Sequence, residues 1–195
     1  MSKKIIFDMD DILWGLNERV TLLNGVDMSK LVTFSTSDNP ILTDEEKFKM
    51  KSCYGYDIIF QNIAWYDGID LLKQLESEDV KVYINSNCGS EKIARYKAQQ
   101  LRKKFDSTDI TFILNLISDC KKKSIDEAFI FVDDSPHNLV DNKGKVQHLI
   151  TINKPWNTSK YALEILGDVD DRLIRCNNLV EVMEKIGDLL NADEK

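Results

Sequence analysis

Residues 3–11 read KKIIFDMDD and residues 128–135 read AFIFVDDS, and in both stretches a short apolar segment runs directly into acidic residues. Apolar runs of this length, without alternation of polar and apolar side chains, are typical of strands that are buried on both faces. Such strands occur in parallel sheets that helices cover from both sides. The chain is therefore predicted to have an α/β fold built on a parallel sheet.

The pattern between and beyond these strands supports this fold. Further strands are predicted over 80–85, 110–116, 146–152 and 172–176, and they alternate with helices predicted over 69–75, 90–105 and 179–190. Residues 14–67 differ, because they mix polar and aromatic residues at helical spacing with turn signals, and 43–46 resemble a helix start. We expect a core of residues 1–13 and 68–195, interrupted by a mainly helical insertion over 14–67.

Length, charge and cysteine content narrow the class of protein. The 195 residues suffice for one domain with an insertion, and the net charge of −7 disfavours a nucleic acid polymer as partner. Apolar runs are too short for a membrane span, and the apolar run after Lys4 is too short for a signal peptide, so we expect a cytoplasmic protein. Four scattered cysteines, without CxxC spacing, indicate reduced thiols and no zinc site.

Polar residues stand where three of the predicted strands end. Asp8 and Asp10 follow the first strand, Asn85–Asn87 the second, and Asp133 and Asp134 the fourth. The carboxyl ends of parallel strands share one edge of a sheet, which is where such folds bind ligands.

Carboxylates that converge at one edge need compensation, since two of them about 4 Å apart repel by roughly 4 kcal/mol at an effective dielectric constant near 20. A cation or a bound proton would supply it. Oxygen ligands without histidine or cysteine select a hard cation, and Mg²⁺ commonly shares its ligand sphere with a phosphate. We therefore expect Asp8, Asp10, Asp133 and Asp134 to form a Mg²⁺ site for phosphoryl transfer.

These motifs, in this order, resemble those of the haloacid dehalogenase (HAD) superfamily of phosphatases over nearly the whole chain. Asp8-Met9-Asp10 is similar to its first motif, Ser86 to its second, and Asp133-Asp134 to its fourth. The lysine run 121–123 stands where the third motif has a lysine. The insertion lies where one class of the superfamily carries a helical cap.

Three segments resemble the 5'(3')-deoxyribonucleotidases more narrowly: Trp65–Leu72, which reads WYDGIDLL, Lys123-Ser124-Ile125, and Asn153–Asn157, which reads NKPWN. Two positions depart from that family. Asp11 stands where these nucleotidases have glycine, and residues 85–87 read Asn-Ser-Asn in place of Thr-Ser-Pro. Asp11 adds negative charge near the expected phosphate.

The resemblance implies a Mg²⁺-dependent phosphomonoester hydrolase that works through an aspartyl-phosphate. Asp8 would be the nucleophile and Asp10 the general acid and base. Ser86 would bind a phosphate oxygen, and Asn87 is a candidate substrate contact. One lysine would offset negative charge, and Lys123 is favoured over Lys121, Lys122 and Lys92 by its place before the fourth-motif strand.

A (deoxy)nucleoside monophosphate is the leading substrate. Alternatives are a phosphatase or phosphotransferase for a non-nucleotide metabolite, and a catalytically idle ligand-binding relative. A nucleotide base would need an aromatic partner, and the candidates, which could equally fill the core of the cap, are Trp14, Phe48, Tyr54, Tyr56, Phe60 and Trp65. The sequence leaves open which of Asp133 and Asp134 binds metal directly, the 5' or 3' preference, and the oligomeric state.

Overall fold

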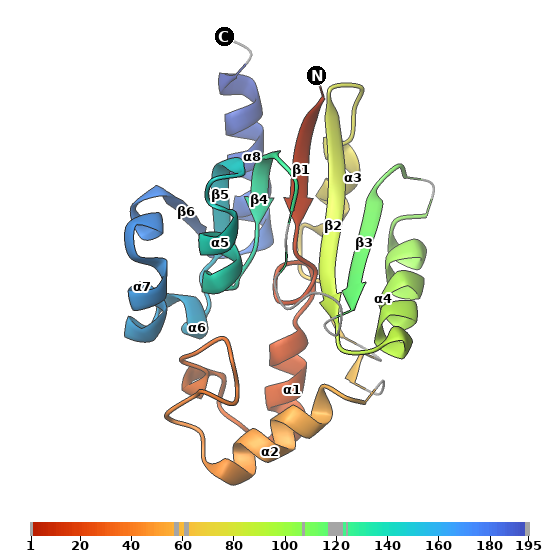
Figure 1. Ribbon diagram of the computed structural model, residues 1–195. Helices are drawn as coiled ribbons and strands as arrows, with labels where there is room; N and C mark the ends of the chain where they lie inside the picture. Colours follow the sequence, from red (N-terminus) through yellow and green to blue (C-terminus); the bar gives the residue numbers. More distant parts are fainter. Residues whose placement is uncertain are drawn as a thin grey trace.

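The structure is a computed structural model that describes residues 2–56, 59–60, 63–106, 108–116, 123 and 125–193. Strands and helices alternate along most of the chain (Figure 1). The strands are β1 (Lys3–Phe7), β2 (Val80–Cys88), β3 (Thr111–Leu116), β4 (Ala128–Val132), β5 (Val146–Ile152) and β6 (Leu173–Cys176). The α-helices are α1 (Leu16–Asn24), α2 (Asp44–Cys53), α3 (Leu72–Leu75), α4 (Glu91–Lys104), α5 (Pro136–Asn142), α6 (Pro155–Thr158), α7 (Lys160–Leu166) and α8 (Leu179–Ala192).

The six strands form one sheet in the order β3-β2-β1-β4-β5-β6, and every pair of neighbours is parallel. The predicted α/β fold with a parallel sheet is confirmed. The first strand lies in the interior, between β2 and β4, where the chain changes its direction of winding. All strands therefore end at one edge, and the ends of β2, β1 and β4 are neighbours there.

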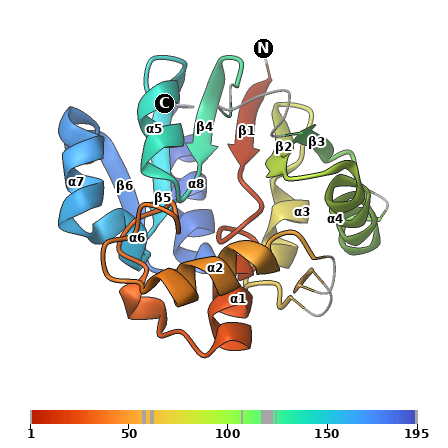
Figure 2. The same cartoon turned by 60° about the horizontal axis from the view of Figure 1, so that its bottom comes forward.

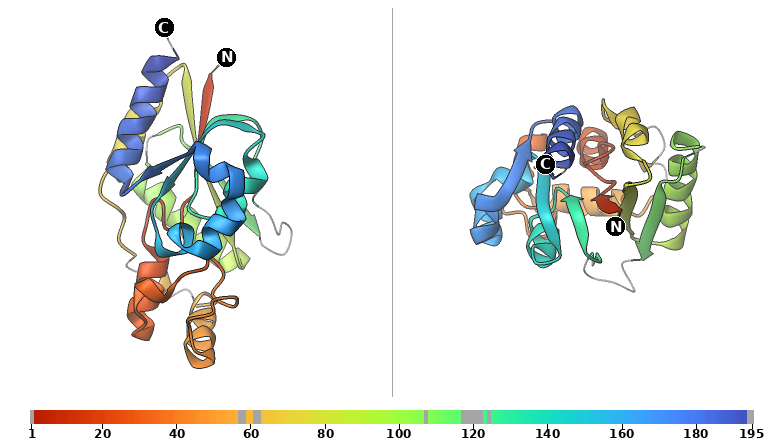
Figure 3. Two further views of the ribbon diagram at one scale, coloured as in Figure 1. Left: turned by 90° about the vertical axis from the view of Figure 1, so that its left-hand side faces the viewer. Right: turned by 90° about the horizontal axis from the view of Figure 1, so that it is seen from above.

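Helices cover both faces of the sheet (Figure 3). Ile5 and Phe7 of β1 point into the core that α8 closes with Val182 and Ile186. Ile6 points the other way, into a second core that contains residues of α5 and α7. This double burial explains why β1 and β4 are continuous apolar runs in the sequence.

The insertion places α1 and α2 across the carboxyl edge of the sheet (Figure 2). Helix α2 begins as predicted, because the Thr43 side chain accepts a hydrogen bond from the Glu46 N–H and the Glu46 carboxylate accepts one from the Thr43 N–H. The insertion is less helical than expected, since 31–43 form a long irregular loop. The side chain of Asn39 organises this loop, donating to the Lys30 carbonyl and accepting from the Ile41 N–H.

Some predicted boundaries are wrong. The second strand, predicted over 80–85, continues to Cys88 because β3 pairs with it through Leu116. Residues 85–87 therefore lie within β2, near its carboxyl end, and not in the loop after it. The helices α5, α6 and α7 were not predicted, since segments of four to seven residues hold too few turns for a periodic pattern. Among the described residues, no helix has the length and apolar character needed to cross a membrane.

Candidate active site

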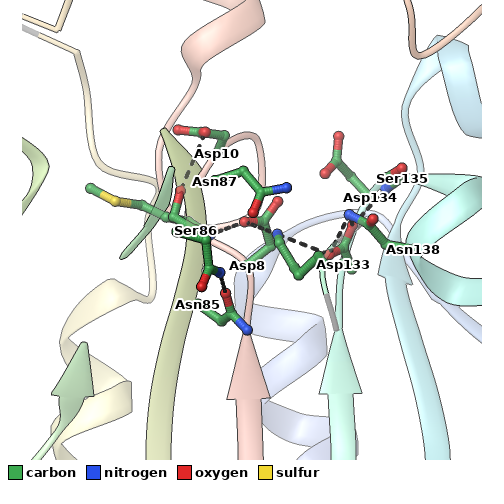
Figure 4. Close-up of polar contacts among 12 residues, drawn as sticks. Asp8, Asp10, Asn85, Ser86, Asn87, Asp133, Asp134, Ser135 and Asn138 are labelled. Atoms are coloured by element: carbon green, nitrogen blue, oxygen red, sulfur yellow. Dashed lines mark hydrogen bonds and ion pairs between the residues drawn. The ribbon is translucent and has the colours of Figure 1, made fainter. Parts of the chain in front are cut away.

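Three neighbouring strands deliver the predicted site residues to one place (Figure 4). Asp8 follows β1, Ser86 and Asn87 lie in the last part of β2, and Asp133 and Asp134 follow β4. The Asp8 N–H donates to the Val132 carbonyl at 2.8 Å, so the sheet register itself brings the ends of β1 and β4 together. Carboxylate oxygens of Asp8, Asp133 and Asp134 all lie within 4.8 Å of one another.

Lys123 lies between two of these acids. Its Nζ is 2.5 Å from Asp8 Oδ1 and 3.2 Å from Asp133 Oδ2, and the side chain is buried. Burial alone would lower the pKa of Lys123, but Asp133 and Asp8 outweigh it and raise this pKa above its ordinary value. The lysine is therefore a permanent positive charge beside Asp8. Lys121 and Lys122 lie outside the described residues, and Lys92 is exposed on α4.

The two acids after β4 have different surroundings. Asp133 accepts hydrogen bonds from the Ser135 N–H at 2.8 Å and from Asn138 Nδ2 at 3.1 Å, in addition to Lys123. Asp134 Oδ2 accepts from Trp156 Nε1 at 2.7 Å. Asp134 Oδ1 is buried and has no hydrogen-bond partner among the residues that the structure describes. Asp134 thus keeps one oxygen available for a ligand, whereas Asp133 does not.

The electrostatics of the cluster favour a cation. Burial, together with Asp133 and Asp10, raises the pKa of Asp8 to about 7 against the opposing effect of Lys123. Burial, then Asp11 and Asp133, raise the pKa of Asp134 well above its ordinary value. If Asp8, Asp10, Asp133 and Asp134 were all ionised, their charge together with Lys123 and with Lys97, a buried lysine that contacts Asp10, would be about −2, which one divalent cation would neutralise. Oxygen donors and an orphaned carboxylate oxygen fit Mg²⁺.

Asp10 lies on the β2 side of the site, where a second buried lysine meets it. Lys97 Nζ of α4 is 2.5 Å from Asp10 Oδ2 and 2.9 Å from Ser86 Oγ. The other oxygen of Asp10 accepts from Trp14 Nε1 at 2.8 Å. Sequence reasoning missed Lys97. A signal existed, because Lys97 falls midway between Ile93 and Leu101 on the face of the helix that was predicted to point inward.

Asp11 is buried and has a φ of 57°, in the left-handed region that favours glycine. Its Oδ1 accepts from the Asn17 N–H at 2.9 Å and its Oδ2 from Asn17 Nδ2 at 2.8 Å. Asp11 therefore caps the start of α1 from outside the helix. Asn17 Oδ1 in turn accepts from the Tyr54 hydroxyl, which ties the loop after β1 to α2 as well. Burial raises the pKa of Asp11 to about 8, so its carboxyl adds less negative charge near the site than the sequence suggested.

A cavity of about 690 Å³ opens above these acids and reaches the insertion. Its walls include Asp8, Asp10, Asp134, Asn87 and both buried lysines. Asn87 Oδ1, like Asp134 Oδ1, is buried without a partner in the described part of the chain.

Three aromatic side chains line the cavity on the side of the insertion: Phe34, Tyr54 and Phe60. Tyr54 and Phe60 were among the predicted candidates, whereas Phe34, which is 43% exposed, was not. Phe48 and Tyr56 are exposed and do not line the cavity. Trp14 and Trp65 pack against each other at 5.2 Å between ring centroids and do not line the cavity. Phe34 carries no sequence signal, because it lies in an irregular loop.

Comparison with known proteins shows which solved structures have a similar fold. No protein-family model and no curated protein sequence matches the chain. Among solved structures, a hydrolase from Pseudomonas syringae has 15% identity and a TM-score of 0.56, with 96% of this chain and 99% of that chain covered. A haloacid dehalogenase-like hydrolase from Streptococcus pneumoniae has 14% identity and a TM-score of 0.57, with 95% and 98% covered.

A candidate HAD hydrolase from Bacillus subtilis, whose structure is bound to magnesium, has 11% identity and a TM-score of 0.54, with 95% and 99% of the two chains covered. The fold is therefore HAD-like, and the structural neighbours from Streptococcus pneumoniae and Bacillus subtilis are described as HAD-like hydrolases. At these identities the likeness concerns the fold. The chemistry has to be inferred from the residues of the site.

Proposed function

We propose that this chain is a Mg²⁺-dependent phosphomonoester hydrolase with Asp8 as its nucleophile. One observation carries the proposal: three buried carboxylates from two adjacent strands converge within 4.8 Å, with a buried lysine between them. This arrangement lowers the stability of the fold, because well-packed apolar side chains at these positions would stabilise the folded state better. It suits a site that binds a cation and a phosphate together.

Asp8 and Asp134 would hold the metal directly, because one Asp134 oxygen has no partner among the described residues, whereas Asp133 is saturated by Lys123, Ser135 and Asn138. The backbone carbonyl of Asp10 is a further ligand by resemblance. When bound, the metal would neutralise charge on the phosphate and on these carboxylates.

The chain's own residues account for the remaining chemistry. The Asp8 carboxylate attacks phosphorus, and the bond from phosphorus to the ester oxygen breaks while Asp10 donates a proton to that oxygen. Water then attacks the aspartyl-phosphate, Asp10 takes a proton from it, and Asp8 and inorganic phosphate are released. Lys123 stabilises the negative charge that develops on the transferring group. Ser86 Oγ would hydrogen-bond one of its oxygens.

We propose a (deoxy)nucleoside monophosphate as the substrate, with residues 14–67 as a cap over a core of 1–13 and 68–195. The cavity is large enough for a ligand of this size and has an aromatic wall on the cap side. Phe34 is the most exposed of the three aromatic residues that line it on the cap side. Nucleobases stack on such rings. The three segments that resemble the deoxyribonucleotidases support the same substrate class.

A substrate panel tests the hydrolase proposal. Phosphate release would be measured from nucleoside 5'- and 3'-monophosphates and from sugar phosphates, with Mg²⁺ and with a chelator. We expect release with Mg²⁺ only, and its loss in Asp8→Asn. Release that is unchanged in Asp8→Asn would disprove the nucleophile, whereas Mg²⁺ and phosphate binding without turnover on any substrate would identify an idle relative.

The substrate class needs its own comparison. Phe34→Ala should raise KM for nucleotides about tenfold, since stacking of one base contributes about 1–3 kcal/mol. Phe48→Ala is the matched control, because Phe48 is an aromatic residue of the same insertion that is 73% exposed and lies outside the cavity. Faster hydrolysis of sugar phosphates than of nucleotides, with no effect of Phe34→Ala, would favour a phosphatase for a non-nucleotide metabolite.

A further inference from the structure

The site contains a second buried lysine, Lys97, which donates hydrogen bonds to Asp10, Ser86 and Asn87. Lys97 is 1% exposed and lies on α4, a helix whose other basic residues are at the surface. Its three ammonium protons point to Asp10 Oδ2 at 2.5 Å, Ser86 Oγ at 2.9 Å and the Asn87 carbonyl at 3.1 Å. Asp10 and Asn87 line the cavity, and Ser86 is fully buried beside them near the end of β2.

Burial of an ammonium group is costly, and a well-packed apolar side chain at position 97 would stabilise α4 as well or better. The neighbouring inward residues of the helix, Ile93 and Leu101, are indeed apolar. The ring of Phe60, from the insertion, has its centroid 5.7 Å from Lys97 Nζ. The charge is therefore held in place between the core and the cap, beside the candidate general acid.

Lys97 and Lys123 contact different acids of the site. Lys123 contacts the nucleophile Asp8 and Asp133, which follow β1 and β4. Lys97 contacts Asp10 and Ser86, on the opposite side of the same cavity. Because Trp14 Nε1 holds the second oxygen of Asp10, the ion pair with Lys97 and this hydrogen bond together restrict the carboxylate to one orientation.

We propose that Lys97 is a positioning residue of the reaction, which acts by orienting Asp10 for proton transfer and Ser86 Oγ for the phosphate. The inference rests on the proposed function, since it assigns Lys97 a role in the same reaction. Misplacement of a catalytic group by about 1 Å can cost about 10²-fold in rate. Loss of Lys97 should therefore lower kcat by about that factor, with a smaller change in KM.

Chemical rescue is the test. Lys97→Ala removes three carbons and the ammonium group, so propylamine has the size and charge of the missing atoms. We expect kcat of Lys97→Ala to fall about 10²-fold and to recover, with saturation, as propylamine is added. Tetramethylammonium at the same ionic strength should not restore it. Lys103→Ala, an exposed lysine of the same helix, is the control and should keep wild-type kcat without a response to amines.

A double-mutant cycle tests whether Lys97 acts through Asp10. In an Asp10→Asn background, Lys97→Ala should lower the remaining rate by less than about threefold, because residues in direct contact are not additive. Full multiplication of the two losses would overturn the proposal. If Lys97→Ala does not fold, Lys97→Met keeps most of the length of the side chain without the charge, and wild-type kcat in that variant would overturn the proposal equally.

The outcomes separate this inference from the proposed function. Wild-type kcat in Lys97→Met, together with inactivity of Asp8→Asn, would reject the role of Lys97 and leave the hydrolase intact. If the wild-type protein hydrolyses no phosphomonoester, the proposed function fails. The role of Lys97 is then tested by the change in Tm on binding of inorganic phosphate in the presence of Mg²⁺. A phosphate-induced rise in Tm that is lost in Lys97→Ala and recovered with propylamine would support the orienting role, and an unchanged rise would reject it.

Discussion

At the scale of single residues, Asp11 shows how one side chain connects the loop after β1 to helix α1. Its backbone has the φ of 57° that glycine adopts without cost. Its carboxyl group, which glycine lacks, accepts from both the backbone and the side-chain amide of Asn17. The strain is thus offset by a cap for α1, and the departure from the nucleotidase pattern has a structural reason.

Asp11→Gly should therefore have a small effect on the free energy of unfolding and a clear effect on hydrogen exchange at the start of α1. It relieves backbone strain and removes a helix cap, two opposing changes of about 1 kcal/mol each, so the free energy of unfolding should change by less than about 1 kcal/mol. Hydrogen exchange at the Asn17 amide should become faster, since its acceptor is lost. Asp11→Asn, which keeps an acceptor oxygen and tolerates a positive φ, is the control and should preserve most of the protection. A large loss of stability, or unchanged exchange at Asn17, would contradict this account.

At the scale of elements, α2 depends on its first turn. The Glu46 carboxylate accepts from the Thr43 N–H at 2.8 Å and from Lys30 Nζ at 2.8 Å. The hydrogen bond from Lys30, followed by those from Thr43, lowers the pKa of Glu46 to about 2. These contacts join α2 to the 3₁₀ turn Met28–Lys30 that precedes the long loop.

The stabilisation from Glu46 should depend on pH. A glutamate whose pKa is about 4.3 in the unfolded chain and lower in the folded protein stabilises the fold fully above that unfolded value. The stabilisation is then lost as the pH falls toward the folded pKa of about 2. Glu46→Gln should consequently have a lower Tm than wild type at pH 6, and the difference should disappear as the pH approaches 2.

Glu164→Gln, at an exposed position of α7, should show no such convergence and serves as the control. Thermal unfolding followed by circular dichroism at several pH values would measure the effect. A difference between wild type and Glu46→Gln that stays constant between pH 6 and pH 2 would show that the Glu46 carboxylate contributes nothing through its charge.

At the scale of the whole molecule, we expect the buried acids to make stability depend on a cation. Burial disfavours the charged forms of Asp8 and Asp134. Nearby carboxylates add to this effect, since Asp133 and Asp10 lie close to Asp8, and Asp11 and Asp133 lie close to Asp134. A ligand that binds only the folded state at 100 times its Kd stabilises that state by about 2.7 kcal/mol. For a chain of this size, Mg²⁺ should raise Tm by about 5–10 °C under that condition.

Asp134→Asn should raise Tm in the absence of Mg²⁺, because it removes a buried charge, and should lose most of the rise that Mg²⁺ causes. Asp126→Asn is the matched control, since Asp126 has a side chain that is 94% exposed and lies away from the cluster, and it should keep the full response. Calorimetry with Mg²⁺ and with a chelator gives the measurement. Equal responses of wild type and Asp134→Asn would exclude Asp134 as a metal ligand.

The sequence by itself determined the parallel sheet and the identity of the acids at the strand ends. Apolar runs such as Ala128–Val132 and the residues that directly follow them are local features, so they can be recognised without the fold. The convergence of Asp8 with Asp133 and Asp134 followed from one general rule, that parallel strands end at one edge.

Only the tertiary structure decided which side chains complete the site. Lys97 meets Asp10 because α4 packs beside β2, and Phe34 faces the cavity because buried Asn39 shapes an irregular loop. The different environments of Asp133 and Asp134 depend on Asn138 and Trp156, which come from two later segments. The inward position of Lys97 on α4 follows a helical spacing that the sequence shows. Its contact with Asp10 and the position of Phe34 depend on the packing of distant elements, which leaves no periodic signal in the order of residues along the chain.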